Sequence, residues 1–378
     1  MAHMADGAGG EGPDGGEARA SRDSRAPYDP GGSSRGFLGE LKDAVSGRAA
    51  LLLIGIFVIE MAFIVSYLGA FHSPTPQRIP VAVVAPAQAE SQVVNGLNAL
   101  QGEPVRATAA ADMRAARQMI LHRNVDAAFV VNPRTTTDRL LLASAGGPSV
   151  AQTVTQILQK TDQANRRTVA ITDIRPPNAA DGRGLSSFYL VVGLVIGGYL
   201  ASAALAMSFG ARPSNVHRVG IRLGSLAVVS LLSGLGGAII VDPLFSALTG
   251  HFVALWWIGV LTTFAAAATG MAFQVLLGQL GIGLSLLVFV VFGNPSSGGV
   301  YPSTLLPPFW RAIGQALPSG AATTLVRNYA YFGGYGTSTA WWVLSAWAAG
   351  GVLVSYAASL PAVRKHALFA APSAPARM

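Results

Sequence analysis

The chain has 378 residues, of which 51% are hydrophobic and only 12% are charged. A soluble domain carries about 25% charged residues, so this composition favours an α-helical polytopic membrane protein. No cysteine is present, which excludes disulfides, thiolate metal sites and lipid attachment through cysteine. The net charge of +8 could suggest nucleic acid, but the arginines flank apolar runs and no Lys/Arg-rich cluster occurs. We therefore expect no nucleic-acid partner.

The segment before the first apolar run falls into two parts. Residues 1–34 are rich in Gly, Asp, Arg, Ser and Pro, which predicts a disordered cytoplasmic tail. Residues 35–48 carry apolar side chains at helical spacing, among them Phe37 and Leu41. This pattern favours an amphipathic interfacial helix, and a plain N-terminal extension of the following span would explain the same spacing.

The first apolar run covers residues 49–71 and is long enough to cross a hydrocarbon core of about 30 Å as a helix. It begins too late and is too long for a cleavable signal peptide, so we expect a signal anchor. Glu60 lies near its middle, where an acidic side chain costs roughly 2.5–3.5 kcal/mol on insertion scales. Either Glu60 faces a cavity, contacting substrate or coupling movement to a proton, or it makes a structural hydrogen bond or lies near an interface.

Residues 74–184 alternate short apolar strands with helices, which predicts a small extracytoplasmic α/β domain inserted between the first two spans. The helices could also form a stalk that continues into the membrane. Asp112 is expected near a helix N-terminus, where its carboxylate suits the dipole, and Asn124 is expected to end that helix in the role usual for glycine. The expected strands are 79–85, 105–109, 127–131, 140–143 and 169–174, and the expected helices are 87–100, 113–122 and 149–167.

Five further spans are expected in a membrane domain at 187–360, which makes six transmembrane helices in all. Basic residues gather before the first span, between the second and third, and after the last. The positive-inside tendency then predicts a multi-pass protein of the cell (plasma) membrane with both termini cytoplasmic, including a tail at 361–378. The approximate bounds of the five spans are 187–209, 222–241, 252–272, 276–293 and 340–360.

No pattern of catalytic residues is found. None of the three lysines follows a glycine, so the GxxxxGK[ST] phosphate loop is absent from the sequence. No HExxH motif occurs, and the six histidines do not cluster at the spacing of metal ligands. We expect neither an enzyme nor a resident cofactor or metal.

Residues 294–338 combine apolar side chains with repeated Pro and Gly, which forbid a continuous helix. Broken backbone at membrane depth survives only where protein or a water-filled cavity covers it. We therefore expect a re-entrant segment of short helices at the outer leaflet, with its two arginines near headgroups or paired with acids. Together with Glu60, the candidates for the substrate path or for coupling are Asn294, Pro295, Ser297, Gly298, Gly299, Arg311 and Arg327.

This segment carries a resemblance. The sequence GNPSSGG, followed by YPSTLLPPFWRAIGQALPSGAATTLVRN, resembles the C-terminal signature of the phage infection protein family, within the type-two membrane permeases of ATP-binding-cassette exporters. The layout of one span, an extracytoplasmic domain and five spans is similar over residues 36–366. In the polar domain, ADMRAARQMILHRNVDAAFVV is similar to the superfamily's helix followed by a short "DAA" strand. The chain departs from many members by its shorter extracytoplasmic region.

The resemblance implies outward export of an amphiphilic or peptide-like substrate by a homodimer in the lipid bilayer, driven by a separate cytoplasmic ATPase. The interfacial helix and the 210–222 loop would be the docking surfaces, with Lys42, Arg212, Arg218 and Arg222 as the candidates. Retention by anionic lipid would explain the same basic residues. Two other functions stay open: an envelope scaffold or receptor without transport, and an ion-coupled secondary transporter, for which only Glu60 qualifies as an intramembrane ionisable residue.

Overall fold

The computed structural model describes residues 47–360. The expected tails at 1–34 and 361–378 lie outside the described residues, as does all but the end of the expected interfacial helix at 35–48. The chain divides into two compact units after Ile54. All contacts described below lie within the second unit, from Gly55 onward.

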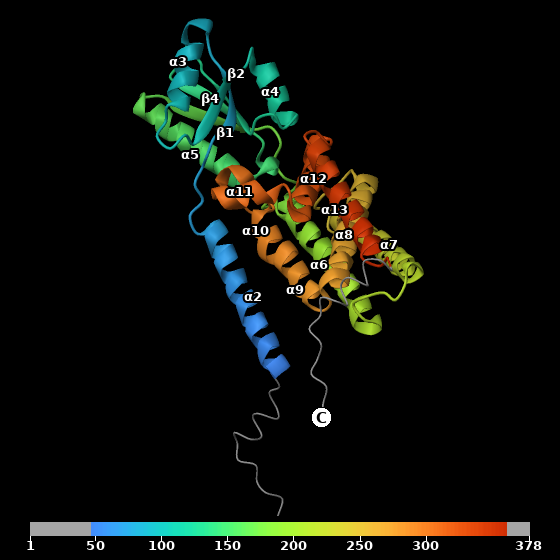
Figure 1. Cartoon of the computed structure of the whole chain (residues 1–378). Helices are drawn as coiled ribbons and strands as arrows, with labels where there is room; N and C mark the ends of the chain where they lie inside the picture. Colours follow the sequence, from blue (N-terminus) through green and yellow to red (C-terminus); the bar gives the residue numbers. More distant parts are fainter. Residues whose placement is uncertain (1–46, 361–378) are drawn as a thin grey trace, which may run out of the picture. The chain divides into compact units, whose positions relative to one another are not determined.

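The described residues contain five helices that are long and apolar enough to cross a membrane (Figure 1). The chain therefore has the make-up of a polytopic membrane protein. One of these helices precedes the α/β domain and four follow it. They are α2 (Gly47–Phe71), α6 (Ser186–Phe209), α7 (Val216–Ile239, extended by a π-turn at Ile240–Leu244), α8 (Phe252–Leu277) and α13 (Ser338–Ala357).

The helix expected at 276–293 differs from the prediction. Helix α8 continues to Leu277, and Gly278 ends it with a left-handed φ of +66°. A shorter apolar helical stretch follows at Leu280–Ser296, about 25 Å long at 1.5 Å per residue. Its parts are α9 (Leu280–Leu286), a π-helical turn (Leu287–Phe292) and α10 (Gly293–Ser296). The turn is tight because Gly281 lies against the backbone of Phe273, where a Cβ would come within 2.4 Å of the carbonyl carbon.

Helix α8 packs against α6, α7 and α13, and a glycine on each of these neighbours permits the close approach. A Cβ on Gly198 of α6 would lie 2.4 Å from the carbonyl oxygen of Thr263. On α7, a Cβ at Gly234 would lie 2.6 Å from the backbone nitrogen of Val260. On α13, Gly351 meets the α8 backbone in the same way. These small residues therefore serve packing within the chain.

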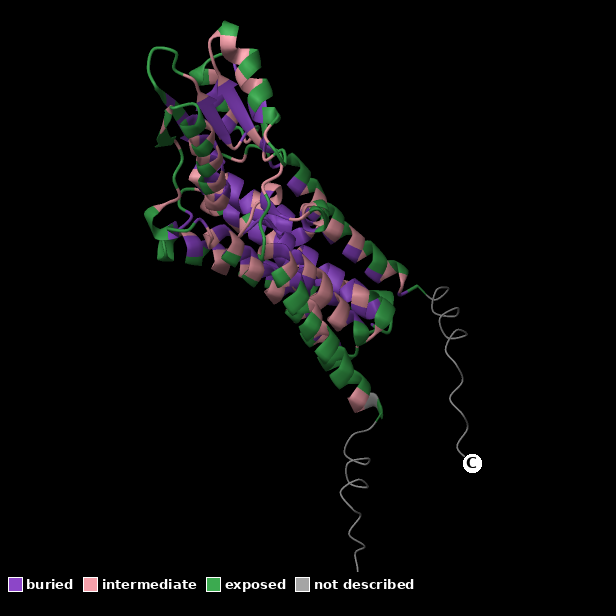
Figure 2. Ribbon diagram, turned by 90° about the vertical axis from the view of Figure 1, so that its left-hand side faces the viewer, coloured by how far each residue is buried: buried purple, intermediate pink, exposed green. Residues whose placement is uncertain are grey.

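Helix α2 is mostly exposed along its length, as Figure 2 shows for the helix that joins the N-terminal trace. Its buried side chains lie near its C-terminal end, where Ser66 donates a hydrogen bond to the carbonyl oxygen of Val291 and Ala70 packs with Trp310. The helix ends at Phe71, before the first strand of the α/β domain. No continuous helical stalk joins the domain to a span in the described residues, contrary to the alternative raised above.

The α/β domain contains a five-stranded sheet in the order β2-β1-β3-β4-β5, parallel except for the β3–β4 pair (Figure 1). This confirms the predicted domain between the first and later apolar helices. Strand β4 begins earlier than expected, and the other bounds differ by a few residues at most. The elements are β1 (Ile79–Val84), α3 (Ala87–Asn98), β2 (Val105–Ala109), α4 (Met113–Leu121), β3 (Ala127–Val130), β4 (Thr137–Leu142), α5 (Pro148–Ala164) and β5 (Thr168–Asp173).

Alternation along β1 assigns the two faces of the sheet. Val81 and Val83 pack in one cluster with Leu97 of α3 and with side chains of α5. Ala82 belongs to the other cluster, with Ile120 of α4. That second cluster continues without interruption into side chains of the membrane helices, so the face covered by α4 is also the face joined to the bundle.

The end of α4 also differs in detail from the prediction. Asp112 caps its N-terminus as expected, accepting a hydrogen bond from the backbone nitrogen of Ala115 at 2.7 Å. The left-handed residue at the other end is Arg123, with φ of +64°, rather than Asn124. An arginine in this conformation is strained by roughly 1–2 kcal/mol relative to the right-handed region, and its side-chain contacts explain why it stands there.

Candidate functional site

A polar cavity of about 210 Å³ lies between the α/β domain and the broken segment. The segment consists of α10, a 3-10 turn at Ser303–Leu305, α11 (Pro308–Gly314) and α12 (Pro318–Phe332). The domain contributes Arg123 and Gly146 to the wall. The polar side chains of the segment that line the cavity are Ser297, Ser303, Gln315, Thr324, Arg327 and Asn328.

Arg327 is the central cation of this site. It is only 6% exposed, and its two terminal nitrogens donate to the carbonyl oxygens of Gly298 at 2.9 Å and Gly299 at 3.0 Å. The break in the helix leaves these carbonyls without helical partners, and the guanidinium supplies them. The Nε–H group of Arg327 has no hydrogen-bond acceptor among the described residues.

Arg311 on α11 has a related role within the segment. Its guanidinium donates to the carbonyl oxygens of Ser303 at 3.0 Å and Leu306 at 2.9 Å. Neither Arg311 nor Arg327 forms an ion pair with a described acid, and Arg327 is buried rather than at a surface. The expectation that these arginines sit at headgroups or pair with acids is therefore wrong for Arg327, and the acid pairing is wrong for both.

Of the remaining candidate residues in the segment, some line the cavity and others are buried by packing. Ser297 and Gly298 line the cavity, and the Ser297 hydroxyl donates to the carbonyl oxygen of Asn294 at 2.7 Å. Asn294 and Pro295 are buried within the short helix α10. Gly299 packs against Phe188 of α6 so closely that a Cβ would lie 2.2 Å from the ring carbon Cδ2. Gly299 thus serves close packing, while its carbonyl holds Arg327.

The α/β domain is joined to the broken segment at several points. A Cβ on Gly147 would lie 2.6 Å from the Cγ atom of Pro302, and the Ser149 hydroxyl donates to the carbonyl oxygen of Val300 at 3.0 Å. The rings of His122 and Tyr335 stack with their centroids 4.1 Å apart. These contacts hold the domain against the broken segment next to the cavity, which Pro302 also lines.

Sequence reasoning missed Arg123 as a site residue. Its guanidinium forms an ion pair with Asp126 at 3.3 Å and lies 4.8 Å from the ring centroid of Phe332 on α12. Gly146 leaves room for it, since a Cβ there would lie 2.4 Å from a guanidinium nitrogen. A basic residue at the end of a helix, where glycine is usual, was the available signal, but its partners are visible only in three dimensions.

Glu60 lies outside this cavity. Its side chain is exposed in the single chain and makes no hydrogen bond or ion pair with the residues that the structure describes. The neighbouring Ile59 lies near α9, where a Cβ on Gly283 would be 3.8 Å from its Cδ1 atom. The roles suggested for Glu60 therefore stay predictions.

The basic candidates for ATPase docking have different surroundings. Helix α7 begins at Val216, earlier than expected, so Arg218 and Arg222 lie within a helix and not in a loop. Arg222 is buried and donates to the last carbonyls of α6, at Phe209 and Gly210, both at 2.9 Å.

Arg212 acts in the same way on α8, donating to the carbonyl oxygens of Val275 and Leu276 at 3.1 Å. Cations at helix C-termini satisfy unpaired carbonyls and suit the dipole. Arg218 remains exposed, and Lys42 lies outside the described residues.

An apolar groove of about 670 Å³ lies between α6 and α7. Two glycines, Gly193 and Gly237, and the aromatic ring of Phe245 contribute to its lining. Its volume is in the ~300–1,000 Å³ range of ordinary small-molecule pockets. The bundle therefore offers an apolar surface as well as the small polar cavity.

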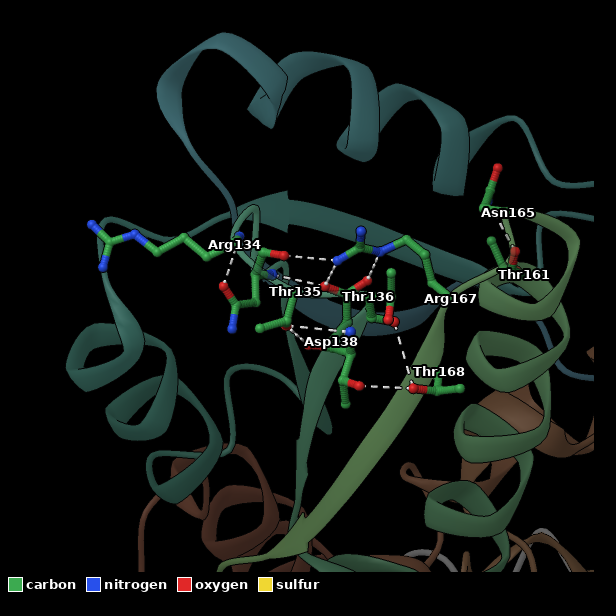
Figure 3. Close-up of polar contacts among 10 residues, drawn as sticks. Arg134, Thr135, Thr136, Asp138, Thr161, Asn165, Arg167 and Thr168 are labelled. Carbon is green, nitrogen blue, oxygen red and sulfur yellow. Dashed lines mark hydrogen bonds and ion pairs between the residues drawn. The ribbon is translucent and has the colours of Figure 1, made fainter.

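A second polar cluster lies in the α/β domain, where Arg167 reaches over Asp138 (Figure 3). Both carboxylate oxygens of Asp138 accept from Arg167 at 2.6 Å, and one also accepts from the backbone nitrogen of Asn132 at 2.7 Å. Asp162 of α5 is buried beside this pair, and its Oδ2 atom has no partner among the described residues. The sequence offered no signal for this cluster.

The two carboxyl groups have opposite pKa shifts. Burial, and after it the neighbouring carboxylate of Asp138, raise the pKa of Asp162 to about 7. Burial also opposes ionisation of Asp138, but hydrogen bonds from Arg167 and Asn132 outweigh it and lower the pKa of Asp138. At neutral pH, Asp138 is ionised against Arg167 while Asp162 is part protonated.

The described residues contain no group of three or more His, Cys, Asp or Glu side chains placed to hold a metal ion. The polar cavity presents guanidinium, amide and hydroxyl groups, which can bind an anion or a polar group but do not form a nucleophile–base pair.

Comparison of the chain with known proteins gave no match to a family model, to a curated protein or to a solved structure.

Proposed function

We propose that this chain is the membrane permease subunit of an ATP-binding-cassette-type exporter. It moves an amphiphilic or peptide-like substrate outward as a homodimer, with a separate cytoplasmic ATPase. The observation that carries the proposal is the junction between the α/β domain and the broken segment. There, Gly147 packs on Pro302, and Arg123 and Arg327 line a polar cavity next to the bundle of apolar helices.

The bundle supports the substrate class. An amphiphile needs an apolar surface and a place for its polar part, and the α6–α7 groove and the polar cavity supply one of each. The resemblance of GNPSSGG and its continuation to the phage infection protein family adds the coupling to an ATPase. The short break after α10 gives the polypeptide a non-helical stretch that a continuous span would lack.

The proposed topology counts Leu280–Ser296 as a crossing, the fifth of six in chain order. At about 25 Å this stretch is shorter than an average hydrocarbon core, and modest local thinning of the bilayer accommodates such a mismatch. With six crossings, the proposed topology has both termini in the cytoplasm of a plasma-membrane protein, together with Arg212 in the α6–α7 turn and Arg218 at the start of α7. The α/β domain then lies on the opposite side.

Purification from the native host in a mild detergent tests the proposal. An ATPase that co-isolates in a fixed ratio and whose hydrolysis rate responds to the chain supports the permease. Arg218→Glu reverses the exposed charge at the docking surface, and we expect it to lower ATPase recovery at least fivefold. Arg117→Glu makes the same change on the exposed surface of α4 and serves as the matched control, with wild-type recovery.

A second candidate, a scaffold or receptor without transport, is favoured by a pocket of about 400 Å³ on the α/β domain. Its lining includes Met113, Asn132, Thr135 and Arg139. Two results together contradict the permease and support this alternative. The chain is isolated without an ATPase, and no export that depends on a proton gradient is detected. A proton-gradient requirement without an ATPase supports the ion-coupled transporter, with Glu60 as its candidate.

A further inference from the structure

The wall of the polar cavity is rich in hydrogen-bond donors that have no acceptor. The Nε–H group of Arg327 has no hydrogen-bond partner among the described residues, although it is buried. The Gln315 side chain accepts from Thr324 through Oε1 at 3.0 Å, which leaves its NH2 group without a partner in the described structure. That nitrogen lies 3.8 Å from where a Cβ on Gly298 would stand, so it faces the same wall.

The charge of the cavity is positive. No carboxylate lines it, while two guanidinium groups do. Arg123 is paired with Asp126, so its charge is compensated nearby. Arg327 is in no ion pair with a described acid, although it is buried. A buried cation without a counter-charge is costly, and an anion that enters the cavity relieves that cost.

Asp181, like Asp126, lies close enough to Arg327 to act on its charge. The carboxylate of Asp181, however, already accepts hydrogen bonds from other groups. One oxygen accepts from the hydroxyl of Tyr331 at 2.6 Å. The other accepts from the backbone nitrogen and the hydroxyl of Ser186, at 2.9 and 2.7 Å. Asp181 therefore moderates the field at Arg327 without taking the position of a ligand in the cavity.

The size of the cavity restricts what can enter it. Its volume of about 210 Å³ is below the ~300–1,000 Å³ of ordinary small-molecule pockets. A single tetrahedral oxyanion fits such a volume and can accept from guanidinium, amide and hydroxyl donors at once. We propose that this cavity binds a phosphate group, supplied either by the headgroup of an anionic phospholipid or by free phosphate. The site requires neither the exporter activity nor the ATPase.

The test uses the full-length chain and two sources of phosphate. In one arm, inorganic phosphate is titrated into protein held in a maltoside detergent, which contains no phosphate. In the other, nanodiscs of phosphatidylcholine alone are compared with nanodiscs that also contain phosphatidylglycerol. Thermal unfolding followed by tryptophan fluorescence reports binding, because a ligand that binds only the folded state raises the unfolding temperature.

The variant Gln315→Glu is chosen because it keeps the oxygen that accepts from Thr324 and replaces the free NH2 donor with a carboxylate. It puts a negative charge on the wall of the cavity that Arg327 also lines. We expect the affinity for the phosphate group to fall at least tenfold while the protein stays folded. Gln152→Glu makes the same chemical change on the exposed face of α5 and should bind as the wild type does.

A rise with inorganic phosphate identifies free phosphate as the ligand, and a rise with phosphatidylglycerol alone identifies the lipid headgroup. Either result supports the site if the rise in unfolding temperature is lost in the Gln315→Glu variant and kept in the Gln152→Glu variant. The proposal is overturned if neither source changes the unfolding temperature of the wild type. It is equally overturned if Gln315→Glu responds as strongly as Gln152→Glu.

Discussion

The guanidinium of Arg123 lies 4.8 Å from the ring centroid of Phe332, and this contact joins the loop after α4 to the end of α12. The same residue has a left-handed backbone and pairs with Asp126. A strained arginine is therefore held in place by contacts that connect the α/β domain to the membrane bundle. Its strain and its contacts can be separated by mutation.

Arg123→Ala removes the contacts and keeps the strain, whereas Arg123→Gly removes both. We expect Arg123→Ala to lower the free energy of unfolding by about 1–2 kcal/mol, from the lost cation–π contact and ion pair. Arg123→Gly should be more stable than Arg123→Ala by about 1 kcal/mol, because glycine accepts a positive φ. Thermal unfolding in detergent measures the order, and equal stabilities of the two variants would contradict the role of strain.

Gly197 and Gly198 are adjacent on α6, but we expect their substitution by alanine to have opposite effects on stability. A Cβ on Gly198 would lie 2.4 Å from the carbonyl oxygen of Thr263, so α6 and α8 must separate. We expect Gly198→Ala to destabilise the protein by about 1–3 kcal/mol. Nothing lies within 4 Å of a Cβ on Gly197, so Gly197→Ala should be neutral or stabilising. The unfolding temperatures of the two variants test this difference. A Gly198→Ala variant as stable as the wild type would show that α6 and α8 do not pack so closely at Gly198.

Asp162 makes stability depend on pH. Its folded-state pKa of about 7 lies above the unfolded value of 3.8, so the folded chain binds the proton more tightly. The stability that this group contributes is complete below pH ~4 and is lost as the pH rises through ~7. The lowered pKa of Asp138 acts in the opposite sense, and only at more acidic pH.

We therefore expect Asp162→Asn to remove most of the decline in unfolding temperature between pH ~4 and ~7, since the amide keeps the size and cannot ionise. Hydrogen exchange at the end of α5 and the start of β4 should show the same loss of pH dependence. Asp173→Asn makes the same chemical change at the exposed end of β5, away from this cluster, and provides the control. A wild-type slope in Asp162→Asn would mean that another group titrates.

The proposed topology places the α/β domain and the α6–α7 turn on opposite sides of the membrane. The chain has no cysteine, so single substitutions give a clean background. Ser91→Cys on α3 should react with an impermeant maleimide in intact cells, because Ser91 is exposed and the proposed topology has its domain outside. Ser214→Cys should react only after the membrane is opened. Labelling of both positions from the same side would rule out this arrangement and the exporter built on it.

Sequence alone determined where most elements lie, because their signals are local. The Val-rich alternation of Ile79–Val84 and the helical stripe of Pro148–Ala164 need no distant partner to be recognised. The same holds for the apolar lengths of α6 and α8 and for the Pro–Gly break after Ser296, since proline and glycine act on their own backbone.

The tertiary structure alone decided how these parts meet. The turn at Gly278, with its positive φ, moved the start of the fifth apolar stretch to Leu280. Arg222 became a partner of helix-end carbonyls rather than an exposed charge. Asp138 and Asp162 are distant in sequence and share one buried cluster, while Arg123 and Arg327 meet at one cavity. Burial, hydrogen bonding and charge compensation depend on neighbours brought together by folding, and no local pattern encodes those neighbours.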